Sequence, residues 1–346
     1  MAQSIAPERR GVRQISLLTR HVDMTLEVMA HATCQQWLDA LLEHTPGTRL
    51  GEDPEALHEM RVAARRLEAA IRLFRDYLPA WVVESRTTLR TVMQALGAAR
   101  DFDVQIEFFR GRKEQLSPDE AKLLEPLEAR LATDRAQAHA QLLQVLDAPE
   151  TQQWLARWTE FSKSVPTALP VPEMAADPAA FALAALRRQY KRVRKAAERL
   201  GSESTAEEYH EVRTRVKRLR YALEAFAPLC GESASKFLRG LVRVQTVLGE
   251  YQDAEVRAGQ LASLARKRSH PLPGTTLLLM GRIVERDARK GRKARRRFPK
   301  VYRCMRGRPW KRLRRSLMAA EGAAAPIIAH SSETGGNARF AARAGA

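Results

Sequence analysis

Two segments of this chain repeat one pattern of residue types, and they constrain its fold more than any other feature. The first, HEMRVAARRLEAAIRLF, occupies residues 58–74, and the second, HEVRTRVKRLRYALEAF, occupies residues 210–226. They align without a gap at an offset of 152, which is 210 minus 58. Two separated motifs that share one offset predict an internal duplication. The second motif is a Leu-Gly pair followed by an aspartate: Leu96-Gly97 with Asp101, and Leu248-Gly249 with Asp253.

Each segment has the periodicity of an amphipathic helix. At about 100° per residue, apolar side chains gather on one side and basic side chains on the other. The apolar sides are formed by Met60, Ala64, Leu67, Ile71 and Phe74, and by Val212, Val216, Leu219, Leu223 and Phe226. The basic sides are formed by His58, Arg61, Arg65 and Arg72, and by His210, Arg213 and Lys217 with Tyr221 beside them. Each helix is therefore expected to bury one face and to display a row of cations.

The composition favours an all-α fold. Ala, Leu, Arg and Glu dominate, aromatic residues make up only 6%, and strand signals are absent from the sequence. Asp53-Pro54-Glu55 is expected to start the first motif helix, and Thr45-Pro46-Gly47 is expected to break the helix before it. The expected helices span about 21–44, 54–78, 80–113 and 117–146, a short one with Trp154 and Trp158, then 179–200, 205–228, 233–267, 275–303 and 310–317.

Breaks in the helical pattern divide the chain into two repeats. Residues 164–178 contain four prolines and no helical period, so they are expected to link repeat one, residues 21–163, to repeat two, residues 179–317. Together the two repeats form one domain from residue 21 to residue 317. We expect residues 1–20 to be a flexible N-terminus and residues 318–346, rich in Ala, Gly and Ser, to be a disordered tail.

The charge of the chain indicates a polyanionic partner. The net charge is +19 and the pI is near 10.5, a balance that suits nucleic acid, an anionic membrane surface or polyphosphate without choosing among them. The charge is also uneven along the chain. Residues 281–315 hold seventeen Lys or Arg against two acids, and the helix near 179–200 is basic whereas its counterpart in repeat one is not.

Sequence signals for a membrane or an oxidising compartment are weak. No run approaches the roughly 18 apolar residues that a membrane span needs, and the first residues contain no apolar signal segment. The isolated Cys34, Cys230 and Cys304 indicate a reducing compartment rather than a disulfide framework or a zinc site. We therefore expect a cytoplasmic protein with no membrane partner, and the sequence leaves its oligomeric state open.

A chain of phosphates fits the row of cations on each motif helix. Basic groups at i, i+3 and i+7 lie roughly 5 to 10 Å apart along one face, and they repel each other unless an anion lies among them. If the repeats pack about a pseudo-twofold axis, both rows line one groove. A row of this kind can also be an ordinary solvated face, but its gapless repetition in both halves favours a binding role.

For the histidines and aspartates of the motifs, the sequence allows two roles each. His58 and His210 are expected to donate to phosphate oxygens rather than to bind a metal, because their neighbours on that face are cations. Asp101 and Asp253 could hold Mg²⁺, and the favoured alternative is that they pair with motif arginines. The chain contains no G-x-S-x-G, P-loop, G-x-G-x-x-G or H-E-x-x-H motif, so we expect binding without catalysis, metal or cofactor.

At these motifs the chain resembles the CHAD family, the histidine α-helical domain. The resemblance is carried by HEMRVAARRL and LGAARDFDV in the first half and by HEVRTRVKRLRYALE and LGEYQDAEV in the second. It implies two pseudo-symmetric four-helix repeats with a central basic groove, binding of inorganic polyphosphate, and association with polyphosphate granules. Family members are often fused to a CYTH-type triphosphatase, whose E-x-E-x-K signature is missing here, so no hydrolase is expected from that source.

Carried over by position, the resemblance assigns ligand contacts to equivalent residues of both repeats: His58, Arg61, Arg65 and Arg66, then His210, Arg213, Lys217 and Arg218. Further basic residues of the motif helices and of the helix near 179–200 complete the predicted polyphosphate site: Arg72, Arg220, Arg187 and Lys191. The alternative function is nucleic-acid binding through the basic region 281–315, although that region lacks the interleaved aromatic residues that stack on bases.

Overall fold

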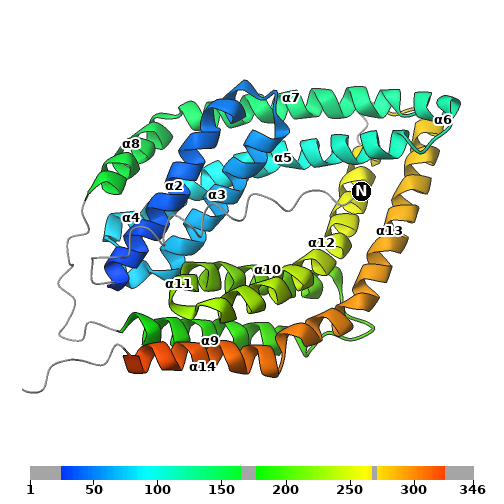
Figure 1. Cartoon of the computed structure of the whole chain (residues 1–346). Coiled ribbons are helices and arrows are strands. Elements are labelled where there is room, and N and C mark those ends of the chain that lie inside the picture. The colour runs from blue at the N-terminus through cyan, green and yellow to red at the C-terminus, as the bar shows by residue number, and fades with distance from the viewer. Residues whose placement is uncertain (1–24, 165–176, 267–270, 324–346) are drawn as a thin grey trace, which may run out of the picture.

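The chain folds into an all-helical structure. A computed structural model describes residues 25–164, 177–266 and 271–323, and within these ranges it contains helices and no strand (Figure 1). The predicted flexible N-terminus, most of the predicted linker and most of the predicted tail lie outside the described residues. No helix in the described ranges is both long and apolar enough to cross a membrane.

The two repeats contain equivalent helices in the same order. Repeat one consists of α2 (Leu26–Leu50), α3 (Pro54–Leu73), η1 (Arg75–Tyr77), α4 (Ala80–Glu84), α5 (Arg86–Lys113), α6 (Pro118–Lys122), α7 (Glu125–Asp147) and α8 (Pro149–Lys163). Repeat two consists of α9 (Pro178–Ala197), α10 (Ala206–Ala225), α11 (Ala227–Cys230), α12 (Glu232–Arg266), α13 (Gly274–Tyr302), η2 (Arg303–Met305) and α14 (Arg308–Ala323).

Packing follows the same order in both repeats. The motif helix, α3 or α10, packs between the first helix, α2 or α9, and the long helix, α5 or α12. The long helix then packs against a returning helix, α7 or α13. A shorter final helix, α8 or α14, covers the first helix of its repeat. When the short α4, α6 and α11 are set aside, each repeat thus has, in the described residues, four main helices and a shorter fifth, and this order matches the predicted duplicated all-α architecture.

Local signals start both motif helices where the sequence predicts. The Asp53 side chain accepts a hydrogen bond from the backbone N–H of Glu55, and Pro54 takes the first helical position of α3. At the start of α10, Thr205 and Glu208 form a reciprocal capping box. These caps set where each helix begins, and the period of its apolar residues then turns the apolar side toward the core and the basic side away from it.

One continuous core joins the two repeats near the C-terminal ends of the motif helices. Phe74 and Phe226, which are equivalent at the 152-residue offset, are both 0% exposed and meet edge to face with ring centroids 5.6 Å apart. Phe181 of α9 stacks on Phe74 at 6.3 Å and meets Phe226 at 5.9 Å. Equivalent aromatic residues therefore form the contact across which the duplication packs.

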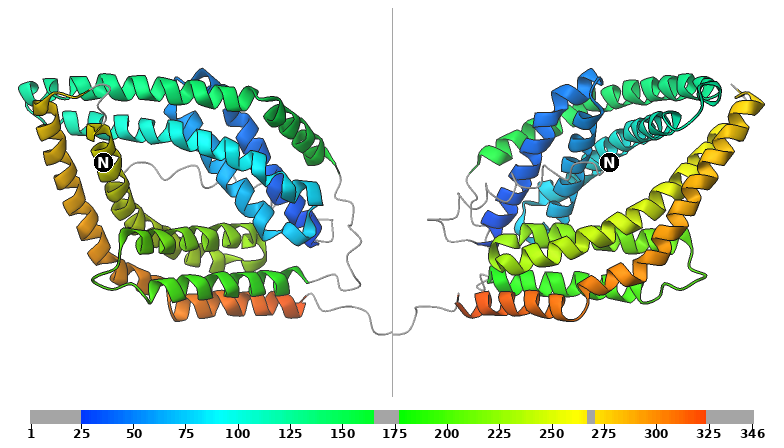
Figure 2. Two further views of the ribbon diagram at one scale, coloured as in Figure 1. Left: turned by 180° about the vertical axis from the view of Figure 1, so that it is seen from behind. Right: turned by 45° about the vertical axis from the view of Figure 1, so that its right-hand side comes forward.

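A second, smaller core joins the far ends of the long helices. α5, α6 and α7 extend away from the first core and meet α12 and α13 at that end, as all three ribbon views show (Figures 1 and 2). Its buried residues include Phe109 and Leu131 from repeat one and Leu261 and Met280 from repeat two. The buried Asp287 of α13 adds ion pairs to Arg112 of α5, at 3.4 Å, and to Arg257 of α12.

The prediction that Thr45-Pro46-Gly47 breaks the first helix is wrong. α2 continues through Pro46 to Leu50, and Gly51 ends it with a left-handed φ of 72° and an N–H that donates to the carbonyl of Gly47. The Thr45 hydroxyl donates to the carbonyl of Leu41 in the turn that the proline disturbs. An added Cβ on Gly47 would lie 2.8 Å from the Cβ of Ala56, so this glycine permits close packing of α2 on α3.

Other helix boundaries also differ from the predictions, among them those of the helix expected from 117 to 146, which is divided into α6 and α7. The helix expected from 80 to 113 is divided at Ser85 into α4 and α5. The predicted start of the tail at residue 318 is too early, because α14 continues to Ala323. Leu313 and Leu317 of α14 are 0% exposed in the main core, and this burial anchors the helix, which then continues by six residues into the predicted tail.

Candidate functional site

Four cations from the two motif helices form a single cluster, which we call the central basic site. It consists of Arg61 and Arg65 of α3 and Arg213 and Lys217 of α10. Burial, together with the positive charges of Arg213, Arg65 and Arg61, lowers the pKa of Lys217 to about 7. Cations of repeat one therefore act on a lysine of repeat two, as expected if both rows line one groove.

Arg61 and Arg213 hold equivalent positions in this site. Each guanidinium lies over the glycine of its repeat's Leu-Gly pair: an added Cβ would be 3.8 Å from the Arg61 Nε at Gly97 and 3.8 Å from the Arg213 Nη2 at Gly249. Burial lowers the pKa of both arginines, and neighbouring guanidinium groups, including Arg65 in each case, add to the effect. The glycine of each Leu-Gly pair thus leaves room for an arginine side chain.

The two motif aspartates face these arginines without balancing the charge. A carboxylate oxygen of Asp253 lies 3.9 Å from the Arg213 Nη2, so the predicted aspartate–arginine pair is confirmed in repeat two. Burial raises the pKa of Asp101, whereas Arg61 and Arg65 oppose that rise. Gln260 of α12 donates to the Asp101 carboxylate at 3.4 Å and so reaches from repeat two into repeat one. Two acids face four cations.

A cavity of about 420 Å³ lies beside the repeat-two half of this site. Its walls come from α10 and α12 and carry basic, acidic and small polar side chains: Arg213, Lys217, Arg220, Gln245, Thr246, Gly249, Glu250 and Asp253. Long, positively charged side chains over a polar wall can donate several hydrogen bonds to an elongated anion.

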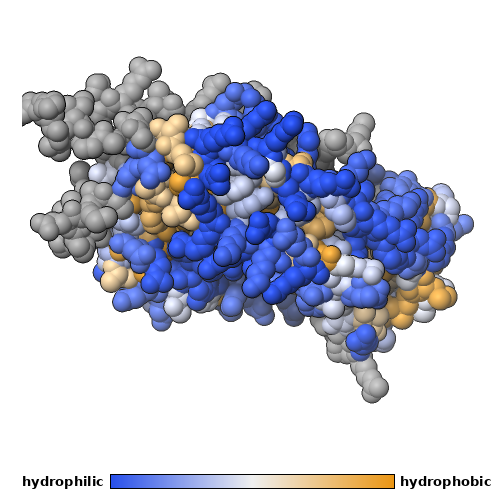
Figure 3. Space-filling model, turned by 90° about the horizontal axis from the view of Figure 1, so that it is seen from below, coloured by the Kyte–Doolittle hydropathy of each residue, from blue (hydrophilic) through white to orange (hydrophobic). Residues whose placement is uncertain are grey.

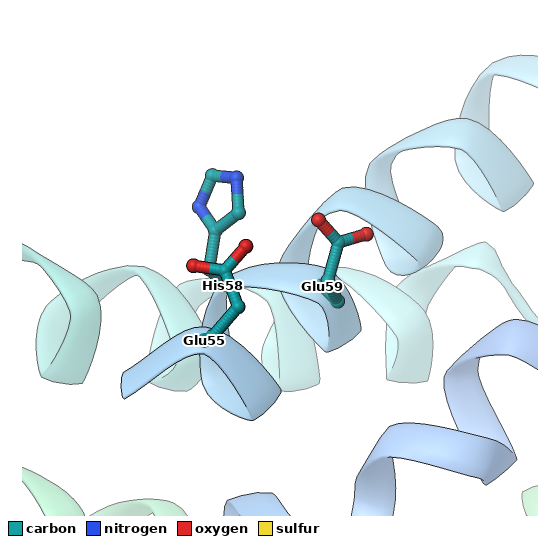
Figure 4. Close-up of side chains that lie close together, drawn as sticks. All are labelled: Glu55, His58 and Glu59. Atoms are coloured by element: carbon teal, nitrogen blue, oxygen red, sulfur yellow. The ribbon is translucent and has the colours of Figure 1, made fainter. Parts of the chain in front are cut away.

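The motif histidines lie at the margin of the site and not in an apolar interior. His58 is half-buried between the carboxylates of Glu55 and Glu59, and ligand atoms of the three lie within 4.8 Å of one another (Figure 4). Burial and Arg100 lower the pKa of His58. His210 is exposed, and its Nε2 is 3.4 Å from the Thr214 hydroxyl. The two histidines are therefore not equivalent in their surroundings.

Arg66, a predicted ligand residue, holds the repeats together. Its Nη1 lies 3.1 Å from a carboxylate oxygen of Glu224 in repeat two. Its guanidinium also lies over the rings of Trp37, at 4.4 Å, and of Tyr221, at 5.6 Å. An arginine paired with an acid and stacked between two rings has little freedom to bind a ligand.

Three further predicted ligands lie near the same contact between repeats. Arg72 lies 3.7 Å from Glu68, and Arg220 lies 2.6 Å from Glu224, each within its own helix. The acid precedes the arginine in α3 and follows it in α10, so the duplication has exchanged the two charges. Arg218 lies at the surface of α10, where partial loss of water and the charge of Arg72 lower its pKa. These residues are predicted ligands that lie outside the central basic site.

The last two predicted ligands lie in a separate place. Arg187 and Lys191 of α9 line a cavity of about 450 Å³ against Trp310 and Lys311 of α14. One neighbour of the central basic site, Arg100 of α5, was not among the predicted site residues, although its charge lowers the pKa of both His58 and Arg61. Its position within LGAARD, directly before Asp101, is the signal that could have identified it.

Comparisons with known proteins agree with this architecture. The solved CHAD domain from the plant Ricinus communis covers 84% of this chain and 95% of its own, with a TM-score of 0.67 and 24% identity. PptA from Streptomyces chartreusis covers 81% of this chain and 100% of its own, with a TM-score of 0.63 and 19% identity. At these identities the two structures establish the fold alone.

Sequence relatives and a family model extend the comparison. The uncharacterized proteins MT2285 and Rv2226, from two strains of Mycobacterium tuberculosis, are 27% identical over 236 residues, which are 61% of this chain. The match spans only 40% of the length of these relatives. Residues 32–262, which include both motif helices and both Leu-Gly pairs, match the model of the CHAD domain. The chain therefore belongs to the CHAD domain family.

Proposed function

We propose that this protein binds inorganic polyphosphate at the central basic site and does so without catalysis. The observation that carries the proposal is the convergence of Arg61, Arg65, Arg213 and Lys217 from both repeats. Burial and the surrounding cations hold the pKa of Lys217 at about 7, so the charged form of this lysine is unfavourable in the free protein. A chain of phosphates restores its charge and neutralises its neighbours, so the ligand stabilises an arrangement that otherwise costs stability.

The residue types suit a linear phosphate chain. Arginine forks bind phosphate oxygens in pairs, and lysine supplies a point charge among them. Affinity should fall steeply with added salt, because each neutralised phosphate releases counterions. We propose that the protein associates in the cytoplasm with polyphosphate granules, where long chains offer many overlapping binding positions.

A charge-reversed variant tests the proposed site. Arg61→Glu with Arg213→Glu removes one guanidinium from each repeat and should abolish binding of long-chain polyphosphate at physiological salt. The matched control is Arg75→Glu with Lys122→Glu, which makes the same change in net charge at side chains that are 69% and 71% exposed. Circular dichroism should report the same helix content in both variants. Unchanged polyphosphate affinity in the site variant would show that the ligand binds elsewhere.

Incubation with polyphosphate, followed by measurement of its chain length, tests the proposal that the protein does not cleave or extend its ligand. Chain length should stay constant in the presence of Mg²⁺, which the Asp101 and Asp253 carboxylates could bind. Shortening that disappears in an Asp101→Asn, Asp253→Asn variant would replace the binding proposal by a hydrolytic one.

A further inference from the structure

A second concentration of cations lies on the side of repeat two away from the central basic site. α9 and α14 pack side by side along one edge of the molecule, and α10 lies between them and α3 in every ribbon view (Figures 1 and 2). The cavity of about 450 Å³ between these helices is lined by six basic side chains, which we call the second basic face: Arg187, Lys191, Arg194, Arg306, Lys311 and Arg314.

The second basic face has almost no acid to balance it. Glu198 lies 3.8 Å from Arg194 and 3.4 Å from Arg306 and thus serves two of the six cations. Within the described ranges, no ion pair joins Lys191, Lys311 or Arg314 to an acid. These side chains are exposed, so their cations are in water and free to contact a large anion.

The same charge imbalance continues onto α13. Its two acids are already engaged: Glu285 pairs with Arg289 and Arg292, and Asp287 pairs with arginines of the far core. Viewed from the side of α9 and α14, the surface is mainly hydrophilic, with hydrophobic patches toward its two ends (Figure 3). The cations therefore form part of a broad polar surface rather than a narrow groove.

Aromatic residues beneath this face are committed to packing. Tyr190 of α9 and Trp310 of α14 stack with ring centroids 4.1 Å apart and planes 8° from parallel. Phe237 of α12 packs against the same indole at 5.9 Å. Since these contacts hold α14 on α9, the two rings are engaged in packing and do not form a separate platform on which unpaired bases could stack.

We propose that the second basic face binds the phosphate backbone of double-stranded nucleic acid without reading its bases. Packed helices lie about 8–10 Å apart, a spacing similar to the groove widths of a duplex, about 6 and 12 Å. Cations on α9 and α14 can therefore contact phosphates of both strands across a groove. A helix the length of α9 extends about 30 Å, along which a duplex presents one charge per roughly 1.7 Å.

Breadth and exposure distinguish this face from the central basic site. The central cations are partly buried and converge on one cluster, which suits a single thin chain. The cations of the second basic face are exposed, and all but Arg306 lie on two neighbouring helices, which suits a wide, rigid polyanion. The inference does not rest on polyphosphate binding, and either can fail without the other.

Charge reversal on α14 tests the proposal. The probe is a fluorescent duplex of about two helical turns, roughly 20 base pairs, in two unrelated sequences. Lys311→Glu with Arg314→Glu should weaken binding on the order of tenfold and reduce the slope of log affinity against log salt by up to about 1.8, which is about 0.9 per phosphate contact. The control is Arg75→Glu with Lys122→Glu, and Lys311→Gln with Arg314→Gln is the milder variant should charge reversal disturb folding.

Three outcomes would overturn the proposal. The first is equal duplex affinity in the α14 variants and the control. The second is strong preference for one duplex sequence, which would require base contacts. The third is loss of duplex binding in the Arg61→Glu, Arg213→Glu variant, or displacement of the duplex by one equivalent of short polyphosphate, because either would place nucleic acid in the central basic site.

Discussion

At the residue scale, Lys217 shows why the two motif helices act together. Its pKa of about 7 depends on burial and on charges from both repeats, with Asp253 as the opposing acid. A motif lysine on an isolated helix would keep an ordinary pKa near 10.5. The sequence supplies the row of cations, but the size of this effect follows only from the packing of α3 against α10.

Polyphosphate affinity should therefore depend on pH in a defined window. Below about pH 7, Lys217 is charged with or without ligand and adds no pH dependence. Above that value the free protein has lost the proton while the complex retains it, so affinity falls as pH rises toward the ordinary lysine pKa. Calorimetry at pH 8 in buffers of different ionisation enthalpy should give proton uptake approaching one per binding event. Lys217→Arg should abolish that uptake, and equal uptake in this variant would assign the proton to another group.

The stability of the free protein should change with pH in the opposite sense. Folding lowers the pKa of Lys217, so between about pH 7 and the ordinary lysine pKa the unfolded chain binds more protons than the folded chain. The free energy of unfolding from this group thus increases with pH across the window. Folding therefore favours the neutral form of Lys217, whereas ligand binding favours its charged form.

At the scale of elements, the duplication explains what the sequence could predict. The 3.6-residue period gave the buried and basic faces of α3 and α10, and Asp53-Pro54-Glu55 gave the start of α3. The continuation of α2 through Pro46 was not predictable, because it depends on packing against α3. The Arg66–Glu224 pair was not predictable either, since it requires knowledge of how one repeat lies on the other.

The contact between equivalent phenylalanines should dominate the stability of the paired repeats. Phe226→Ala leaves a cavity against Phe74 and Phe181 and should lower the free energy of unfolding by about 3–5 kcal/mol. Leu50→Ala is the control, because this side chain is 73% exposed and its loss should change stability by less than about 0.5 kcal/mol. Denaturant titration followed by circular dichroism measures both. Equal midpoints for the two variants would mean that the repeats are held mainly by their far ends.

At the scale of the whole molecule, the repeats share two buried cores, and the central basic site lies between these cores along α5. Gly97 lies beneath Arg61, and farther along the same helix Arg112 joins Asp287 of repeat two. The duplication could have given two separate sites, one per repeat. The shared position of the cations instead predicts one site for the pair.

The number of polyphosphate chains bound per protein tests this claim most directly. Calorimetric titration with a short chain is performed in the Lys311→Glu, Arg314→Glu background, so that the second basic face does not add binding. Our account predicts a stoichiometry of one chain per protein, and Arg61→Glu alone should then weaken binding of that chain to both repeats. Two equivalent chains per protein, of which Arg61→Glu removes only one, would contradict it.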